Sequence, residues 1–236
     1  MFSVAQSPRP LIFAHRGASV EASENSLAAF RRAIAVRADG IELDARVTRD
    51  GVAVVFHDAN LRRLTGKTGR IDRLTWRELT QFRLPNGEGI PRLADVLRLT
   101  RGKLIVQIEI KAGTPVAPVV RAVQAARATA SVVLASFDAA LVRAAARLAP
   151  AVPRMLISEG RASPTALVRQ LAACSAGGLS VDFRAVKGAD WVRFLHSRGV
   201  AVWCWTVNDA AVARRLAGWE IQAVLGDNPA LLRRAL

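Results

Sequence analysis

Sulfur-containing and imidazole side chains are scarce in this chain of 236 residues, which has two cysteines, two methionines and three histidines. Cys174 and Cys204 form no CxxC motif, and neither has a histidine nearby at metal-ligand spacing. This argues against a disulfide scaffold and against a zinc site built on thiolates. We expect two buried free thiols.

Long apolar runs are also missing. No run approaches the roughly 18 residues of a membrane span, and the opening MFSVAQSPRPLIFAHRG lacks the basic and apolar regions of a secretory signal. We therefore expect a cytoplasmic protein with no transmembrane segment. Hydrophobic residues make up 51% and charged residues 22%, as in globular proteins. We expect residues 1–236 to form a single domain.

Lysine contributes little to the formal charge of +15, because only Lys67, Lys103, Lys111 and Lys187 are lysines. The arginines are scattered through helix-like segments and are not gathered in one arm or interleaved with aromatic residues. This pattern favours a dispersed basic surface over a nucleic-acid groove, so we expect no nucleic-acid partner. Such a surface attracts small anionic substrates.

Short β-branched runs alternate with longer segments whose apolar residues recur three and four apart, as in amphipathic helices. The predicted strands are Leu11–Ala14, Gly40–Asp44, Leu104–Ile110, Val132–Ala135, Val152–Ile157, Gly178–Val181, Val200–Trp205 and Ala223–Leu225. The predicted helices include Ser26–Val36, Pro115–Ala128, Ala139–Leu148, Thr165–Ala173, Trp191–Arg198 and Asp209–Ala217. Eight such units predict an α/β fold of the (β/α)8 TIM barrel type. An open doubly wound sheet is less favoured, because no GxGxxG follows the first strand.

One segment departs from this alternation. Two short runs, Val47–Arg49 and Val52–Phe56, flank an Asp-Gly pair and predict a β-hairpin. Further helices are predicted near Trp76–Phe82 and Leu93–Leu99. We interpret about residues 59–89 as a small insertion in the second βα unit, too short to be an independent domain.

Three carboxylates lie at the ends of predicted strands, where TIM barrels place their active sites. Side chains two apart on a strand share a face, so Glu42 and Asp44 point the same way, as do Glu109 and Lys111. Glu42, Asp44 and Glu109 can then converge on one cation, and oxygen ligands suit Mg²⁺ or Ca²⁺. The alternative is that they pair with arginines at the barrel rim. We favour a metal site, because burying unpaired charge is costly.

Two histidines also follow predicted strands, His15 after the first and His57 after the hairpin. Cleavage of a phosphodiester needs a base for the attacking oxygen and an acid for the leaving oxygen. Histidine titrates near neutral pH, so the two residues can divide these roles. His196 lies in a helix-like stretch and is interpreted as structural.

Arg16 and Lys111 provide fixed positive charge beside these groups. An arginine offers paired N–H donors to phosphoryl oxygens and a lysine offers a point charge. Such groups stabilise the charge that builds in the transition state. Arg16 could instead form a salt bridge with Glu24 at the rim.

Seven motifs occur in order within residues 10–232: Phe13–Gly17, Ser23–Ser26, Asp39–Asp58, Gln107–Lys111, Ser136–Phe137, Trp205–Asn208 and Gly226–Pro229. As a set they resemble the glycerophosphodiester phosphodiesterase family. The resemblance implies hydrolysis of a small-molecule glycerophosphodiester to sn-glycerol 3-phosphate and an alcohol, with one divalent metal ion, Mg²⁺ or Ca²⁺. It leaves open whether the glycerol 2-hydroxyl attacks first, through a cyclic phosphate.

The same resemblance assigns roles to nine residues. Glu42, Asp44 and Glu109 would bind the metal, His15 and His57 would be the catalytic acid–base pair, Arg16 and Lys111 would contact phosphate, and Trp205 and Phe137 would pack on glycerol. The family usually has proline at the position of Ser23 and threonine at that of Gly226. Gly226 therefore lacks a hydroxyl at the end of the eighth strand.

Two other functions remain possible on the sequence alone. One is a related phosphodiesterase acting on lysophospholipids or other lipid-derived phosphodiesters. The other is a non-catalytic phosphate or nucleic-acid binder, which the intact histidine pair argues against. The leaving alcohol is not specified by the motifs, and we expect the insertion at about 59–89 to select it.

Overall fold

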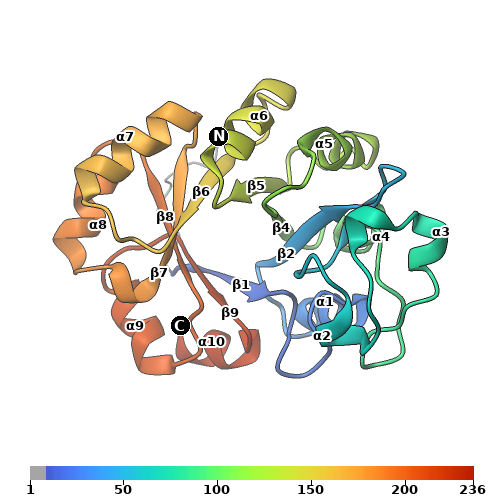
Figure 1. The fold of residues 1–236 in the computed structure, drawn as a ribbon. Coiled ribbons are helices and arrows are strands. Elements are labelled where there is room, and N and C mark those ends of the chain that lie inside the picture. The colour runs from blue at the N-terminus through green and yellow to red at the C-terminus, as the bar shows by residue number, and fades with distance from the viewer. Residues whose placement is uncertain (1–8) are drawn as a thin grey trace.

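The computed structural model describes residues 9–236. Eight parallel strands form a closed barrel with helices outside it (Figure 1). The barrel strands are β1 (Leu11–His15), β2 (Gly40–Val47), β4 (Ile105–Ile110), β5 (Val132–Ser136), β6 (Arg154–Ser158), β7 (Gly178–Asp182), β8 (Ala201–Trp205) and β9 (Ala223–Gly226). Since β1 pairs with both β2 and β9, the ring is complete. The predicted TIM barrel is confirmed.

Helices follow most strands, and their side-chain caps explain where several of them begin. They are α1 (Leu27–Ala35), α4 (Leu93–Thr100), α5 (Val116–Ala125), α6 (Ala139–Leu148), α7 (Pro164–Cys174), α8 (Ala189–His196), α9 (Ala210–Ala217) and α10 (Pro229–Ala235), with a 3₁₀ turn, η2 (Phe183–Ala185), after β7. Ser26 and Asp209 accept hydrogen bonds from backbone N–H groups in the first turns of α1 and α9. The predictions did not specify α10, which starts with a proline behind the capping residue Asn228.

The second βα unit differs from the prediction in detail. The predicted β-hairpin is confirmed, but its first strand lies earlier in the chain than Val47–Arg49, because β2 runs without a break to Val47 and its last residues pair antiparallel with β3 (Ala53–Val55). The chain then forms α2 (Arg62–Thr65), η1 (Ile71–Arg73) and the short helix α3 (Trp76–Leu79). These pieces share a small core of their own, made of Val54, Phe56, Leu61, Ile71, Leu79, Leu84 and Ile90.

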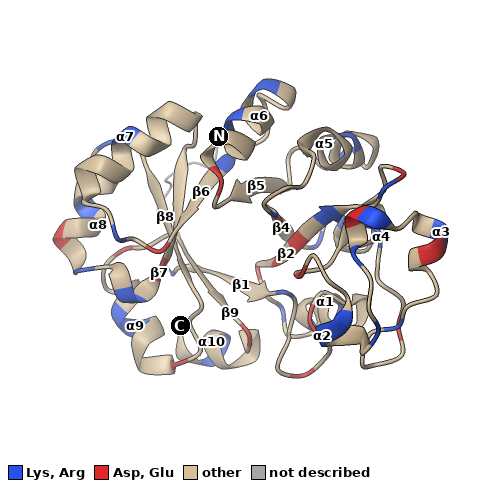
Figure 2. Cartoon of the chain, viewed as in Figure 1, with Lys and Arg blue, Asp and Glu red and all other residues tan. Residues whose placement is uncertain are grey.

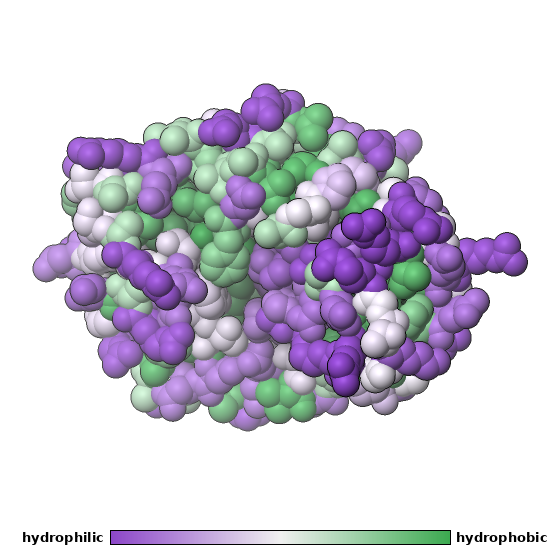
Figure 3. Space-filling model, in the orientation of Figure 1, coloured by the Kyte–Doolittle hydropathy of each residue, from purple (hydrophilic) through white to green (hydrophobic). Residues whose placement is uncertain are grey.

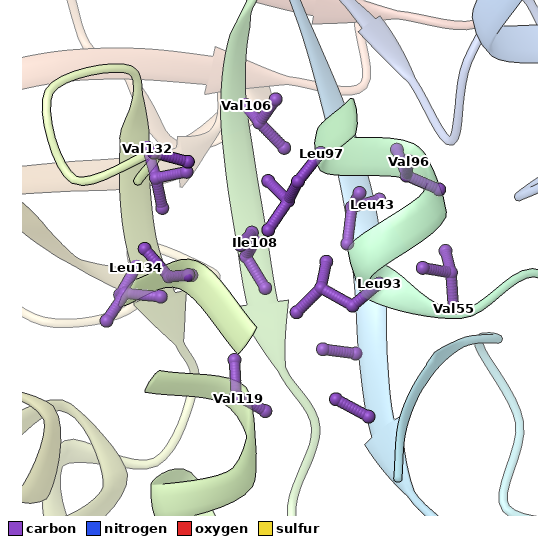
Figure 4. Packing of buried hydrophobic residues seen from close by; sticks show 14 of the residues in the cluster. Leu43, Val55, Leu93, Val96, Leu97, Val106, Ile108, Val119, Val132 and Leu134 are labelled. Atoms are coloured by element: carbon purple, nitrogen blue, oxygen red, sulfur yellow. The ribbon is translucent and has the colours of Figure 1, made fainter. Parts of the chain in front are cut away.

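Apolar side chains fill both the barrel interior and the layer between strands and helices. Figure 4 shows the outer layer, where residues such as Ile108 and Leu134 pack against α4 and α5. Inside the barrel, the rings of Phe13 and Trp203 lie 4.5 Å apart. A Cβ atom at Gly40 would come within 2.3 Å of the Phe13 ring, so this position requires glycine. Because the barrel interior is filled by these side chains, the candidate site lies at the ends of the strands.

Asp39 ties the first strand of the barrel to the second. Its carboxylate accepts hydrogen bonds from the Ile12 backbone N–H at 2.8 Å and from two guanidinium nitrogens of Arg9 at 2.7 and 3.0 Å. Burial by itself raises the pKa of Asp39, but these hydrogen bonds outweigh burial and hold the pKa below its ordinary value. The charged form therefore stabilises the fold.

We expect Asp39→Asn to lower the free energy of unfolding by about 1.5–3 kcal/mol near neutral pH, the range for hydrogen bonds to charged groups. Because the folded-state pKa is depressed, this contribution is complete above an unfolded-state pKa of about 3.9 and is lost as pH falls through the folded-state value. Urea unfolding of both proteins should show a smaller difference between their free energies of unfolding at about pH 3 than at about pH 7. An equal difference at both pH values would contradict a stabilising role for the charged form of Asp39.

Candidate active site

Three buried carboxylates converge at the mouth of the barrel. Glu42 and Asp44 come from β2 and Glu109 comes from β4, where it lies directly opposite Asp44 in the strand register. Each offers an oxygen, and these oxygens all lie within 4.8 Å of one another. Figure 2 shows the acidic stretch of β2 that contributes to this cluster. The convergence expected from the two-residue spacing is observed.

The electrostatics of this cluster favour an added cation. Burial and the charge of Asp44 raise the pKa of Glu42 to about 8, and the same two causes raise the pKa of Glu109. Burial also acts on Asp44, but Lys111 and Arg16 overcome it and lower the pKa of that carboxyl. The three oxygen donors are of the kind that Mg²⁺ and Ca²⁺ prefer. The donor set therefore fits a hard divalent ion, which would offset the mutual repulsion.

The two cations expected at the site are both present. Lys111 Nζ lies 2.5 Å from Glu109 Oε1 and 3.2 Å from Asp44 Oδ1. Arg16 Nη1 lies 3.1 Å from Glu24 Oε1, so the alternative salt bridge does form. The same guanidinium also lies beside the cluster, with Nε 3.4 Å from Asp44 Oδ2. The pairing with Glu24 thus holds Arg16 at the site and does not remove it.

A tight turn after β1 shapes this side of the site. Arg16 and Gly17 both have positive φ, 56° and 83°, and the Arg16 backbone N–H donates to Glu42 Oε2 at 3.1 Å. A Cβ atom at Gly17 would lie 2.6 Å from that of Ala29, so only glycine fits there. Asn25 donates from Nδ2 to Asp44 Oδ2 at 2.7 Å. Sequence reasoning quoted Asn25 within a motif and gave it no role.

His15 is held by a carboxylate that directly follows the last strand, β9. Its Nδ1 lies 2.7 Å from Asp227 Oδ1, and its Nε2 lies 3.9 Å from Glu42 Oε2. Burial lowers the pKa of His15, but the hydrogen bond to Asp227 and the charge of Glu42 more than offset burial and raise it. Asp227, a residue that sequence reasoning also left without a role, therefore fixes the ring with Nε2 toward the cluster.

The hydrogen bonds at the end of β9 are complete although Gly226 has no side chain. A Cβ atom there would lie 2.2 Å from the Val207 carbonyl oxygen, so the chain has no room for threonine. Asn208 provides the local hydrogen bonds, because its Oδ1 accepts from the Asp227 N–H at 2.8 Å and its Nδ2 donates to Asp227 Oδ2 at 2.6 Å. The Asn208 amide thus satisfies both the Asp227 N–H and one Asp227 carboxylate oxygen without a side chain at position 226.

His57 has a similar carboxylate partner on the other side of the cluster. Its Nδ1 lies 2.6 Å from Asp58 Oδ1, and Asp58 Oδ2 accepts from Arg63 Nε at 2.5 Å. Arg46 Nε donates to the His57 carbonyl oxygen at 2.8 Å. The Phe56 N–H donates to the Asp44 carbonyl, which brings this loop back to the end of β2. Each of the two histidines thus has Nδ1 engaged by an aspartate.

An aromatic pair forms the opposite wall of the mouth. Phe137 follows β5 and Trp205 ends β8, and their rings meet edge to face with centroids 5.7 Å apart. Phe137 is 49% exposed, which is unusual for a large apolar side chain. Figure 3 shows hydrophobic surface on the β6 to β8 side of the centre and hydrophilic surface over α2. The mouth has one apolar wall and one charged wall.

The glycerophosphoryl diester phosphodiesterase family model matches residues 15–231. The chain belongs to this family. A probable glycerophosphodiester phosphodiesterase 2 of Mycobacterium tuberculosis is 32% identical, over 96% of this chain and 90% of its own length. Among solved structures, a glycerophosphodiester phosphodiesterase from Agrobacterium tumefaciens is 27% identical, with a TM-score of 0.86 over 95% of this chain and 99% of that one. The enzyme from Thermotoga maritima is also 27% identical, with a TM-score of 0.81 over 96% and 98%.

Membership of the glycerophosphoryl diester phosphodiesterase family confirms the resemblance seen in the sequence and makes the protein a phosphoric diester hydrolase. Within residues 9–236, no helix is long and apolar enough to cross a bilayer. His196 lies apart from the cluster on α8, where its Nε2 is 2.7 Å from Gln222 Nε2.

Proposed function

We propose that this family member hydrolyses glycerophosphodiesters to sn-glycerol 3-phosphate and an alcohol, with one divalent ion, Mg²⁺ or Ca²⁺. The observation that carries the proposal is the meeting of three buried carboxylates with two histidines whose Nδ1 atoms are each held by an aspartate. We further propose that residues 1–236 act as one domain, with the insertion at about 59–89.

Glu42, Asp44 and Glu109 are proposed to hold the metal ion. A bound divalent ion would polarise a phosphoryl oxygen as a Lewis acid and offset the negative charge of the diester. The preference for Mg²⁺ or Ca²⁺ depends on the number and rigidity of the ligands, and the proposal includes either ion.

His15 and His57 are proposed to move the protons. Because Nδ1 of each ring is engaged by Asp227 or Asp58, Nε2 is the atom left to exchange a proton with the substrate. One ring takes the proton of the attacking oxygen, and the other gives a proton to the leaving oxygen. Direct attack by water and attack by the glycerol 2-hydroxyl use the same pair.

The remaining residues are proposed to position the substrate. Arg16 and Lys111 flank Asp44 and can donate to the non-bridging phosphate oxygens. Phe137 and Trp205 offer an apolar wall to the glycerol carbons. Phosphate charge would thus be met by the cations while the carbon chain packs on the aromatic rings.

The proposal predicts that the purified protein releases glycerol 3-phosphate from glycerophosphocholine and glycerophosphoethanolamine only while a divalent ion is present. Removing the ion with a chelator should abolish the reaction, and adding back Mg²⁺ or Ca²⁺ should restore it. An enzyme-coupled assay for glycerol 3-phosphate measures both. Absence of product with every divalent ion tested, or full activity in excess chelator, would refute the proposal.

A second candidate substrate is a lysophospholipid. Val20, 64% exposed, and Phe137 are two large apolar side chains left open to solvent around the mouth, where an acyl chain could lie. Including lysophosphatidylcholine in the same assay and measuring released choline distinguishes the two substrates.

Cys174 and Cys204 are buried free thiols, as expected. They fit the reducing cytoplasm, where we propose that the enzyme acts on a small molecule without a nucleic-acid partner.

A further inference from the structure

A pocket of about 590 Å³ opens beside His57, and no role has been given to it so far. Its polar lining consists of Arg46, His57, Asp58, Asn60, Arg62 and Arg63. Around the barrel, β2, the loop after β3 and α2 supply these residues, whereas the end of β8 and the residue after β5 supply the aromatic wall. The Phe56 N–H donates to the Asp44 carbonyl oxygen, so the loop that carries His57 lies beside the acid cluster at the end of β2.

The pocket carries an excess of positive charge. Arg63 is already paired, with Asp58 at 2.5 Å and with Glu24 at 2.8 Å. Arg46 and Arg62 are different, because neither forms a salt bridge within residues 9–236. Arg46 and Arg62 therefore line the pocket without a salt-bridge partner among the described residues.

Arg46 in particular is a partly desolvated cation. Its Nε donates to the His57 carbonyl oxygen, which is a neutral acceptor. The Arg46 side chain is half-buried, so water solvates it only in part. A guanidinium in this position gains most from a carboxylate or phosphate, because its hydrogen bonds to anions are about twice as strong as neutral ones.

The geometry of the mouth indicates what reaches this pocket. If the phosphate lies at the acid cluster and glycerol packs on Phe137 and Trp205, the other ester arm must extend away from the aromatic wall. The pocket beside His57 is available to that arm, because neither Phe137 nor Trp205 lines it. This pocket is then the site of the leaving alcohol, and His57 is the residue placed to protonate the leaving oxygen.

We propose that this pocket selects glycerophosphodiesters whose leaving alcohol carries an anionic group, and that Arg46 and Arg62 recognise that group. The inference rests on the proposed function and names the substrate class within it. A carboxylate or a phosphate on the alcohol would satisfy the same chemistry, whereas an alcohol bearing only an ammonium group would be disfavoured.

Glycerophosphoserine and glycerophosphoethanolamine provide the test, because their leaving alcohols differ by one carboxylate. We expect kcat/KM to be about tenfold higher for the serine diester at low ionic strength. The preference should shrink as salt is added, because screening weakens interactions between accessible charges. Glycerophosphoglycerol, whose leaving alcohol is neutral, should fall between the two.

Two variants connect the preference to the pocket. Arg62→Gln should reduce the ratio of the two kcat/KM values by about threefold or more, and Arg46→Gln should do the same. Arg62 is the cleaner test, because Arg46 also contacts the backbone of His57. Arg77→Gln is the matched control, since Arg77 is exposed on α3 and does not line the pocket. It should leave the ratio unchanged.

Failure of this inference can be told apart from failure of the proposed function. Equal kcat/KM values for the serine and ethanolamine diesters would overturn the inference alone. A serine preference that survives both pocket substitutions would also overturn it. If neither diester is hydrolysed with any divalent ion, the proposed function fails and the inference fails with it.

Discussion

Replacing Glu42 with glutamine is expected to lower kcat/KM for glycerophosphodiesters by about a thousandfold or more, because a metal ligand is lost. The same change should leave the metal-free protein equally stable or more stable by about 1 kcal/mol. Burial and Asp44 raise the pKa of Glu42, so the folded state resists its negative charge, and a neutral side chain removes that cost. Glutamine still offers an oxygen to the Arg16 N–H.

Steady-state kinetics and urea unfolding in chelator measure the two effects. Divalent metal should raise the melting temperature of the wild type and raise that of the variant much less, since binding to the folded state stabilises it. Glu21→Gln, an exposed acid in the loop after β1, is the control and should retain activity. A Glu42→Gln enzyme with wild-type kcat/KM would rule out the metal assignment, and parallel loss of stability and activity would indicate a structural role.

His57→Asn should reduce kcat by about 10²–10⁴-fold on natural diesters, the usual contribution of general acid–base catalysis. If His57 protonates the leaving oxygen, the loss should be much smaller for a diester of glycerol phosphate and p-nitrophenol, because that phenolate leaves without a proton. His15→Asn should be impaired on both substrates. The comparison of the two variants on the two substrates therefore assigns the general acid and the general base separately.

His196→Asn is the control for these substitutions, because His196 hydrogen-bonds to Gln222 on the outside of the barrel. Its kinetics should match those of the wild type on both diesters. Comparable losses for His57→Asn on the natural and nitrophenyl substrates would argue against a role as general acid.

The strands could be predicted closely because each is a short run of mostly buried, mostly apolar residues, as expected for strands covered on both faces in a barrel. Helix ends were harder to place. α5 ends at Ala125 and not at the predicted Ala128, since Arg127 has a positive φ of 51° that ends the helix. The first strand of the hairpin was predicted too late in the chain, because nothing in the sequence pattern marks where β2 leaves the barrel and pairs with β3.

For the site, strand periodicity was enough to place Glu42 and Asp44 on one face. Topology brought Glu109 beside them, because β2 and β4 are neighbours. The aspartates that hold the histidines were not assigned, although both lie in quoted motifs. Asp227 is 212 residues from His15, and contacts at such a separation follow from the closed ring and not from local pattern. A role for Arg46 could not be predicted from the sequence, because arginines are frequent and dispersed along this chain.

The hydrogen bond between His15 and Asp227 has a consequence for synthesis of the enzyme. It forms across the seam where the first strand meets the last. During synthesis on the ribosome, His15 is made early, whereas Asp227 is made only after the last barrel strand, β9. We therefore expect the nascent chain to be inactive toward diesters until β9 and Asp227 have left the ribosome and the ring of strands has closed.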